Sequence, residues 1–260
     1  MYKNEETHDR LTTQDDWRSA WGESKPLLNF DPGKPFFLDL HKLLQRTLPV
    51  NKEFRCLEIG CYPGTYLWYF NKYFQYQVSG IEYVEELAHR SRDHLRQLGI
   101  DADIHQADIF DFSPGEKWDV VFSVGLIEHF LNTEDIINQH LKLLKPGGYL
   151  VLIIPHHSGL NGKILKAVDP KIYKIHNQMD YAAMKEGLEK TRAATIIEGG
   201  YYGHLGFWNT NLYPKLREMG QVPYFMGRCL FYSIEHIAQY IIPNMPYFAP
   251  NCALIARKMS

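Results

Sequence analysis

The sequence has few cysteines and no long apolar run. Its four cysteines form no C-x-x-C pair and no metal-ligand spacing. We interpret them as reduced packing residues, of which only Cys61 is placed to contact a ligand. No run approaches the roughly 20 apolar residues that span a bilayer, and residues 1–6 lack the apolar core of a secretory signal. We therefore expect a cytoplasmic protein without membrane insertion.

The sequence also lacks an excess of charge of either sign. Lysine and arginine number 28 against 30 acidic residues, which gives a formal net charge of -2 and a pI near 6.6. The basic residues are scattered, so the electrostatic footprint of a nucleic-acid-binding protein is missing and a small-molecule partner is favoured. At 260 residues with 45% apolar content, the chain can bury one substantial core. No feature of the sequence indicates an oligomeric state.

Residues 54–65 have the pattern of a buried strand, a glycine turn and the start of a helix. Backbone amides at such a helix start face a ligand. A dinucleotide fingerprint G-x-G-x-x-G that begins at Gly60 needs glycine at two positions that hold Tyr62 and Thr65. The glycine spacing therefore disfavours a nicotinamide oxidoreductase.

Glu58, Gly60 and Gly64 instead resemble the first motif of class I S-adenosylmethionine-dependent methyltransferases, acidic-x-Gly-x-Gly-x-Gly. Tyr62 stands where the middle glycine of that motif is usual. Further matches follow in the order of the family: a second strand at 78–82 that ends in Glu82, a third strand at 102–107 followed by Asp108, a fourth strand at 118–125 that leads into 126–130, and a glycine turn with a fifth strand at 144–155. Together these matches cover residues 54–155.

The resemblance implies that the chain binds S-adenosylmethionine. In a doubly wound sheet the second strand ends beside the first glycine turn, so Glu82 is expected to accept both ribose hydroxyls. In the family, Asp108 would accept from the adenine amine and Ile109 would pack on the ring. We expect Tyr62 to point away from the cofactor, because the turn needs only backbone approach there. The predicted cofactor-binding residues are Glu58, Gly60, Cys61, Tyr62, Gly64, Glu82, Tyr83, Asp108, Ile109, Ser123 and Gly125.

Strands and helices alternate through residue 155, which is typical of a parallel sheet with helices on both faces. A sixth strand is expected at 193–198, and a last strand at 251–257 runs antiparallel in the family. The predicted fold is α/β, a doubly wound seven-stranded, mostly parallel sheet. We expect a helical N-terminal extension at 1–50 and a methyltransferase domain at 51–260. Insertions at about 156–179 and 201–249 should form a cap over the carboxyl edge and an aromatic acceptor pocket.

The remaining segments carry weaker signals. Polar residues up to about position 12 predict a loose lead-in to a helix that Thr13 caps together with Asp16. Trp17 and Trp21 share one face of that helix, where they either close over a ligand or dock on the domain. Within the insertions we expect helices at 211–219 and 233–242. Residues 156–179 show no strong periodicity.

Methyl transfer from a sulfonium requires alignment and exclusion of water more than covalent chemistry. A hydroxyl acceptor also benefits from a base. His129, after the fourth strand, is the first candidate and His156, after the fifth, is the second, although either could be a structural histidine. No metal site is predicted, since Asp119 lies early in the fourth strand and no further carboxylate and amide complete a site.

The aromatic insertions favour a small or medium-sized, partly apolar acceptor, such as a natural product, a glycan or a phenol, and we favour O-methylation. A second interpretation is a non-catalytic binding protein that keeps the S-adenosylmethionine fold, because Tyr62 replaces a glycine in the contact loop. Turnover of an acceptor separates the two.

Overall fold

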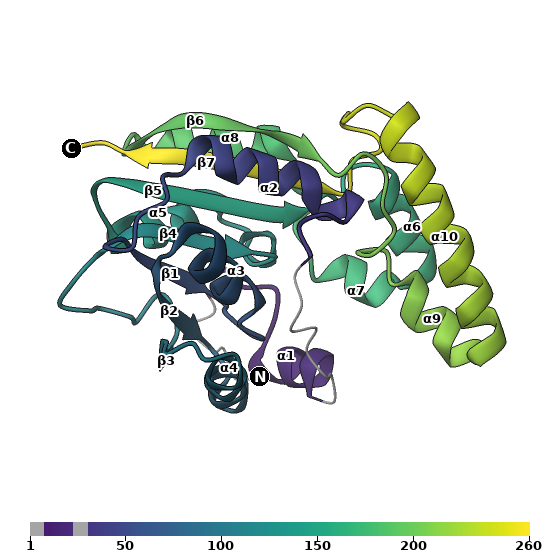
Figure 1. Cartoon of the computed structure of the whole chain (residues 1–260), viewed down its shortest axis with the longest axis horizontal. Helices are drawn as coiled ribbons and strands as arrows, with labels where there is room; N and C mark the ends of the chain where they lie inside the picture. The colour runs from purple at the N-terminus through teal and green to yellow at the C-terminus, as the bar shows by residue number, and fades with distance from the viewer. Residues whose placement is uncertain (1–7, 23–30) are drawn as a thin grey trace.

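A seven-stranded sheet organises the chain, as the computed structural model shows (Figure 1). The structure describes residues 8–22 and 31–260, so parts of the predicted extension, 1–7 and 23–30, lie outside the described residues. The strands follow the order β3-β2-β1-β4-β5-β7-β6. They are β1 (Arg55–Ile59), β2 (Gln77–Glu82), β3 (Asp103–Gln106), β4 (Trp118–Val124), β5 (Leu144–Pro155), β6 (Ala194–Tyr202) and β7 (Asn251–Lys258). Strand β7 is antiparallel to both of its neighbours, β5 and β6, and the other pairs are parallel, which confirms the predicted fold class.

Helices cover both faces of the sheet and bury an apolar core on each. They are α2 (Pro35–Thr47), α3 (Thr65–Phe74) and α4 (Glu85–Gln97) on one face, and α5 (Thr133–Leu143) and α8 (Tyr181–Thr191) on the other. Strand β5 sends Val151 into the first core and Leu152 into the second. Burial on both faces explains why this strand reads as an uninterrupted apolar run.

Four further helices gather beyond the carboxyl ends of β5 and β6 (Figure 1). They are α6 (Leu160–Val168), α7 (Pro170–Lys174), α9 (Leu212–Met219) and α10 (Gln221–Ile241). Helices α6 and α7 differ from the expectation that 156–179 lacks regular structure. The side chain of Asp169 accepts from two backbone amides at the start of α7, and Pro170 occupies its first position, where no amide donor is needed.

Helix α10 begins well before the predicted start at residue 233. Pro223 falls in its first turn, where a helix tolerates proline. Gly227 lies inside the helix against Leu216 of α9, and a Cβ atom at this position would collide with the Leu216 side chain. Both residues are typical helix breakers in a sequence. Here Pro223 suits the helix start, and Gly227 allows close packing of α9 on α10.

Backbone hydrogen bonds hold the N-terminal segment, which was predicted to be loosely attached. The Leu11 amide donates to the His129 carbonyl at 2.8 Å, and Arg10 forms an isolated antiparallel bridge with Phe130. Helix α1 (Gln14–Trp21) follows, and the capping box between Thr13 and Asp16 is present as predicted. The backbone pairing therefore fixes residues 9–11 against residues 129–131, which lie beyond β4 at the end of a short 3₁₀ helix.

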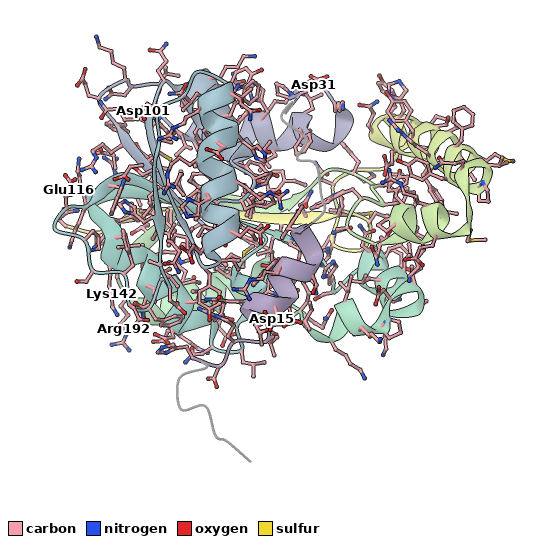
Figure 2. The ribbon with its side chains drawn as sticks, turned by 90° about the horizontal axis from the view of Figure 1, so that it is seen from below. Asp15, Asp31, Asp101, Glu116, Lys142 and Arg192 are labelled. Carbon is pink, nitrogen blue, oxygen red and sulfur yellow. The ribbon has the colours of Figure 1, made fainter. Side chains whose placement is uncertain are left out.

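Charged residues of both signs surround the body of the domain. Glu116, Lys142 and Arg192 lie at the end of the molecule opposite α9 and α10 (Figure 2). Cys229 is exposed on α10, unlike the other three cysteines, which are buried as expected of packing residues. Among the described residues, no helix has the length and apolar character to cross a membrane.

Candidate functional site

The glycine turn after β1 is built by local backbone constraints. Gly60 has a φ of +74° and Gly64, which precedes α3, has a φ of +89°, a region that side chains disfavour. The amides of Gly60 and Cys61 both donate to the Ile81 carbonyl, at 2.8 and 3.1 Å. A Cβ atom on Gly64 would lie 3.0 Å from the Leu95 side chain. The turn is therefore fixed between the ends of β1 and β2 and the side of α4.

The carboxylate of Glu82 lies beside this turn at the end of β2. Its Oε2 accepts from the Tyr62 amide at 3.2 Å and its Oε1 accepts from the Val84 amide at 3.1 Å. Burial raises the pKa of Glu82, and these amides oppose the rise by stabilising the charged form. Each oxygen keeps a further lone pair, so the carboxylate can still accept from a diol such as ribose.

The Tyr62 ring is directed toward α4 and α1. It packs with Val84 and Leu87, and its centroid lies 5.6 Å from the Trp21 ring and 5.0 Å from the Arg90 guanidinium. These contacts give the side chain a place of its own on the flank of the turn. The ring is therefore held on the flank of the turn by contacts with α4 and α1, and Tyr62 also lines the large cavity described below.

The predicted adenine end of the site contains Asp108, Ile109 and Tyr83, and Arg10 closes it. The Arg10 guanidinium lies 2.8 Å from Asp108 Oδ1 and 4.2 Å from the centroid of the Tyr83 ring. Ile109 and Tyr83 line a remaining cavity of about 40 Å³. That volume holds a few waters rather than a purine, because the arginine side chain occupies much of this end.

A larger cavity of about 590 Å³ joins the glycine turn to helices α6 and α7. The turn contributes Gly60, Cys61 and Tyr62, and Glu58 lies beneath it. Both insertions and both N-terminal helices supply the opposite walls. Their lining residues include Trp17, Trp21, Phe37, His157, Leu165, Ile172, His176, Trp208, Asn209 and Asn211. The cavity is mostly apolar with a few polar groups, which is typical of a small-molecule site.

Glu58 presents a buried carboxylate to this cavity. The residue is 3% exposed, and its Oε2 has no hydrogen-bond partner among the described residues. Burial raises the pKa of Glu58 well above its ordinary value, and the neighbouring Glu82 raises it further. A cationic group in the cavity, such as the ammonium of an amino-acid tail, would stabilise the charged form.

Three histidines line the same cavity near the end of β4. His129 ends a short 3₁₀ helix (Ile127–His129), and its Nδ1 lies 2.9 Å from the Ile175 carbonyl. Since a carbonyl only accepts, Nδ1 donates and Nε2 carries the free lone pair. Burial lowers the pKa of His129 to about 3, and that of His157 likewise to about 3, so both rings are neutral. The rings of His129 and His157 lie 4.5 and 4.7 Å from that of His176.

Five sequence-predicted residues line neither cavity: Gly64, Glu82 and Asp108, whose contacts are given above, and also His156 and Ser123. His156 is buried against Tyr201, and its Nδ1 bonds to the Ala249 carbonyl at 3.0 Å. Ser123 is buried on β4 and its hydroxyl pairs with His140 Nε2 at 3.0 Å, toward α5. His157 lines the large cavity in place of His156, and Gly125, just beyond β4, lines it while Ser123 does not.

Glu128, His157, His176 and Arg10 are the site residues that the sequence analysis did not select. Glu128 could have been selected from the sequence, because it directly precedes the candidate His129. The other three lie in the insertion or the N-terminal segment, where no repeat or motif fixes their position relative to the sheet.

Comparisons with known proteins indicate the family of the chain. A family model described as a methyltransferase domain matches residues 36–198. Over 100 residues the chain is 31% identical to a dTDP-3-amino-3,4,6-trideoxy-alpha-D-glucopyranose N,N-dimethyltransferase from Streptomyces venezuelae, a match that covers 37% of this chain and 40% of that protein. Over 162 residues it is 28% identical to 27-O-demethylrifamycin SV methyltransferase from Amycolatopsis mediterranei (strain S699), with 58% and 60% covered. The chain thus spans less than two thirds of these curated relatives.

A solved structure shares the fold at low identity. Phosphoethanolamine N-methyltransferase 2 from Haemonchus contortus, in complex with S-adenosyl-L-methionine, superimposes with a TM-score of 0.64 at 16% identity. The superposition covers 96% of this chain and 60% of that chain. The sheet and its flanking helices are therefore common to both proteins.

Proposed function

Because the chain belongs to the family of S-adenosylmethionine-dependent methyltransferases, we propose that it transfers the methyl group of this cofactor to a hydroxyl of a small or medium-sized, partly apolar acceptor. The observation that carries the proposal is one cavity that joins the glycine turn to neutral histidines with a free ring nitrogen. The turn would hold the methyl donor, and the histidines would face the acceptor.

Within this proposal, the residues of the sheet edge hold the donor. Glu82 accepts the ribose hydroxyls, Glu58 faces the ammonium of the methionine part, and the backbone of Gly60 approaches the cofactor. Asp108 and Ile109 receive the adenine after Arg10 moves aside. The amide contacts of the Glu82 carboxylate and the buried Oε2 of Glu58 in the cavity wall support these roles.

The cap, proposed to comprise 156–179 and 201–249, and α1 hold the acceptor and exclude water. Trp17, Trp21 and Trp208 give the cavity flat apolar walls, which suit a ring-bearing or partly apolar molecule. The acceptor oxygen attacks the methyl carbon, the carbon–sulfur bond breaks, and its electron pair remains on sulfur. A histidine of the cavity, His129 or His157, takes the proton that the hydroxyl loses.

Hydroxyl specificity is favoured by this set of histidines. An amine acceptor can attack as its neutral form, whereas a hydroxyl gains from a positioned proton acceptor. His156 remains a sequence prediction for this role, but its bond to Ala249 directs it away from the cavity lining.

The test is a matched panel of acceptors with S-adenosylmethionine as donor. Pairs of deoxysugar nucleotides, polyketides and phenols that differ only in a hydroxyl or an amine would be compared. Release of S-adenosylhomocysteine and the mass of the product would be measured. We expect a methyl ether on a hydroxylated acceptor. Methylation of amines alone would contradict the hydroxyl assignment, and cofactor binding without turnover on any acceptor would favour a non-catalytic role.

A further inference from the structure

Glu128, His129 and His176 form a cluster of potential metal ligands in the wall of the large cavity. One ligand atom from each lies within 4.8 Å of the other two. All three residues line the same cavity as the glycine turn. The cluster combines the end of β4 with the segment after α7, so it exists only because the first insertion folds back onto the sheet edge.

The carboxylate of Glu128 has no protein partner that explains its burial. The residue is 2% exposed, and neither Oε1 nor Oε2 accepts a hydrogen bond from any described residue. A buried carboxylate without a donor or a cation is costly. Its backbone is nevertheless fixed, because the Asn177 amide donates to the Glu128 carbonyl. The side chain therefore lies buried in the cavity wall with both oxygens available as ligands for a cation.

The two imidazoles are oriented as metal ligands usually are. Nδ1 of His129 donates to the Ile175 carbonyl at 2.9 Å, and Nδ1 of His176 donates to the Ile172 carbonyl at 2.7 Å. A metal-binding histidine typically donates its other ring N–H to a carbonyl or carboxylate, which fixes the tautomer and the ring. Here the arrangement leaves both Nε2 atoms with a lone pair and without a proton.

We propose that Glu128, His129 and His176 bind a zinc ion in the acceptor cavity. Two imidazoles and one carboxylate suit zinc, which takes such a set in catalytic sites and keeps a fourth position open. Magnesium and calcium prefer oxygen ligands alone. A tetrahedral zinc separates its ligand atoms by about 3.4 Å, so binding draws the three side chains together, and Glu128 has no hydrogen bond to break.

From the sequence we predicted no metal site, because Asp119 lies early in β4, at the opposite end of this strand from Glu128. Asp119 is paired there with Lys145 and the Arg55 amide. The ligands proposed here include His176 from the insertion, which no sequence spacing connects to Glu128 and His129.

The role of the ion, unlike its binding, rests on the proposed function. An acceptor hydroxyl in the open position of the zinc would lose its proton more readily. His157 remains outside the ligand set, with Nε2 near the Asn209 carbonyl and its ring 4.7 Å from His176, and it takes that proton at Nδ1. The oxygen then forms the new bond to carbon as the carbon–sulfur bond breaks.

Zinc binding can be measured without an acceptor. The full chain would be stripped with a chelator and titrated with zinc chloride by calorimetry, and the cobalt-substituted protein would be examined by visible absorption. We expect one zinc per chain and the absorption bands of tetrahedral cobalt. Glu128→Gln and His176→Ala should each lower zinc affinity by at least about 100-fold, more than the loss of an outer hydrogen-bond partner. The matched control His236→Ala, on exposed α10, should bind zinc like the wild type.

Binding of S-adenosylhomocysteine separates this proposal from the proposed function. Folding of each variant would be checked by circular dichroism, and cofactor affinity would be measured in the same preparations. Wild-type protein that binds S-adenosylhomocysteine but no zinc, or variants that bind zinc as tightly as the wild type, would overturn the metal site alone. Zinc binding that depends on the three residues, in a chain that fails to bind the cofactor, would support the metal site and contradict the proposed donor site.

Discussion

Arg10 should act against cofactor binding, since its side chain occupies the adenine end of the site. The guanidinium pairs with Asp108 at 2.8 Å and covers the Tyr83 ring at 4.2 Å. In the proposed function, adenine takes the same carboxylate and the same space. We therefore expect Arg10→Ala to bind S-adenosylhomocysteine more tightly than the wild type.

The magnitude follows from the two contacts that the cofactor must break. A charge-assisted hydrogen bond contributes about 1.5–3 kcal/mol, and a cation–π contact contributes about 0.5–1 kcal/mol. Arg10 and Asp108 side chains retain 11% and 16% exposure, and the released arginine regains water and rotamer freedom. We expect a net gain of about 1–2 kcal/mol in Arg10→Ala, which corresponds to roughly a 5- to 30-fold increase in affinity.

Calorimetry with S-adenosylhomocysteine measures this effect, and Arg18→Ala is a matched control. Arg18 lies on α1, is more exposed, and pairs only locally with Asp15 and Gln14. The backbone bonds of Leu11 and Leu131 should keep the N-terminal segment in place in the Arg10 variant. Weaker cofactor binding in Arg10→Ala than in Arg18→Ala would refute the competition and indicate that Arg10 contacts the cofactor directly.

Two further variants test the ribose carboxylate and a buried histidine. Glu82→Ala should lower cofactor affinity at least about tenfold, because it loses two charge-assisted bonds of about 1.5–3 kcal/mol each; calorimetry against Glu116→Ala, an exposed control, measures this, and equal affinities would exclude the ribose role. His140→Gln should flatten the acid dependence of stability. Burial lowers the pKa of His140 to about 4 from 6.5. Between pH 6.5 and pH 4 the unfolded chain therefore binds more protons than the folded chain. The free energy of unfolding falls as pH drops through this range, by up to about 3 kcal/mol. Urea unfolding at pH 7 and pH 4.5 should show a smaller loss in His140→Gln than in the wild type, and an equal loss would place the effect on other groups.

The donor side of the site could be predicted because its signals are local. Glu58, Gly60 and Gly64 lie on one strand–turn–helix unit, and Glu82 ends the next strand along the chain. The register of a buried parallel sheet then fixes their relation in space. The turn conformation at Gly60 and Gly64 and the amide contacts of Glu82 follow from the same short stretches of sequence.

The contact of Arg10 at the adenine end and the acceptor side of the site could not be predicted in the same way. Arg10 meets Asp108 across 98 positions, and His129 bonds to Ile175 across 46. Such contacts depend on how the N-terminal segment and the insertion fold back, which no period in the sequence encodes. The predicted helix at 233–242 was shorter than α10 for a related reason. Gly227 reads as a helix breaker in the sequence, and its advantage, close packing against Leu216, is visible only in the structure.

The candidate activating residues belong to two different parts of the fold. Glu128 and His129 follow β4 directly, so their distance from the donor turn is set by the rigid sheet. His157 and His176 belong to the segment beyond β5, whose helices α6 and α7 lie outside the sheet (Figure 1). In the proposed function, the position of that segment therefore controls whether the activating groups meet, whereas the donor contacts of Glu82 and the glycine turn belong to the sheet edge. Changes within 156–179 should alter acceptor turnover while cofactor affinity, set by Glu82 and the glycine turn, stays the same.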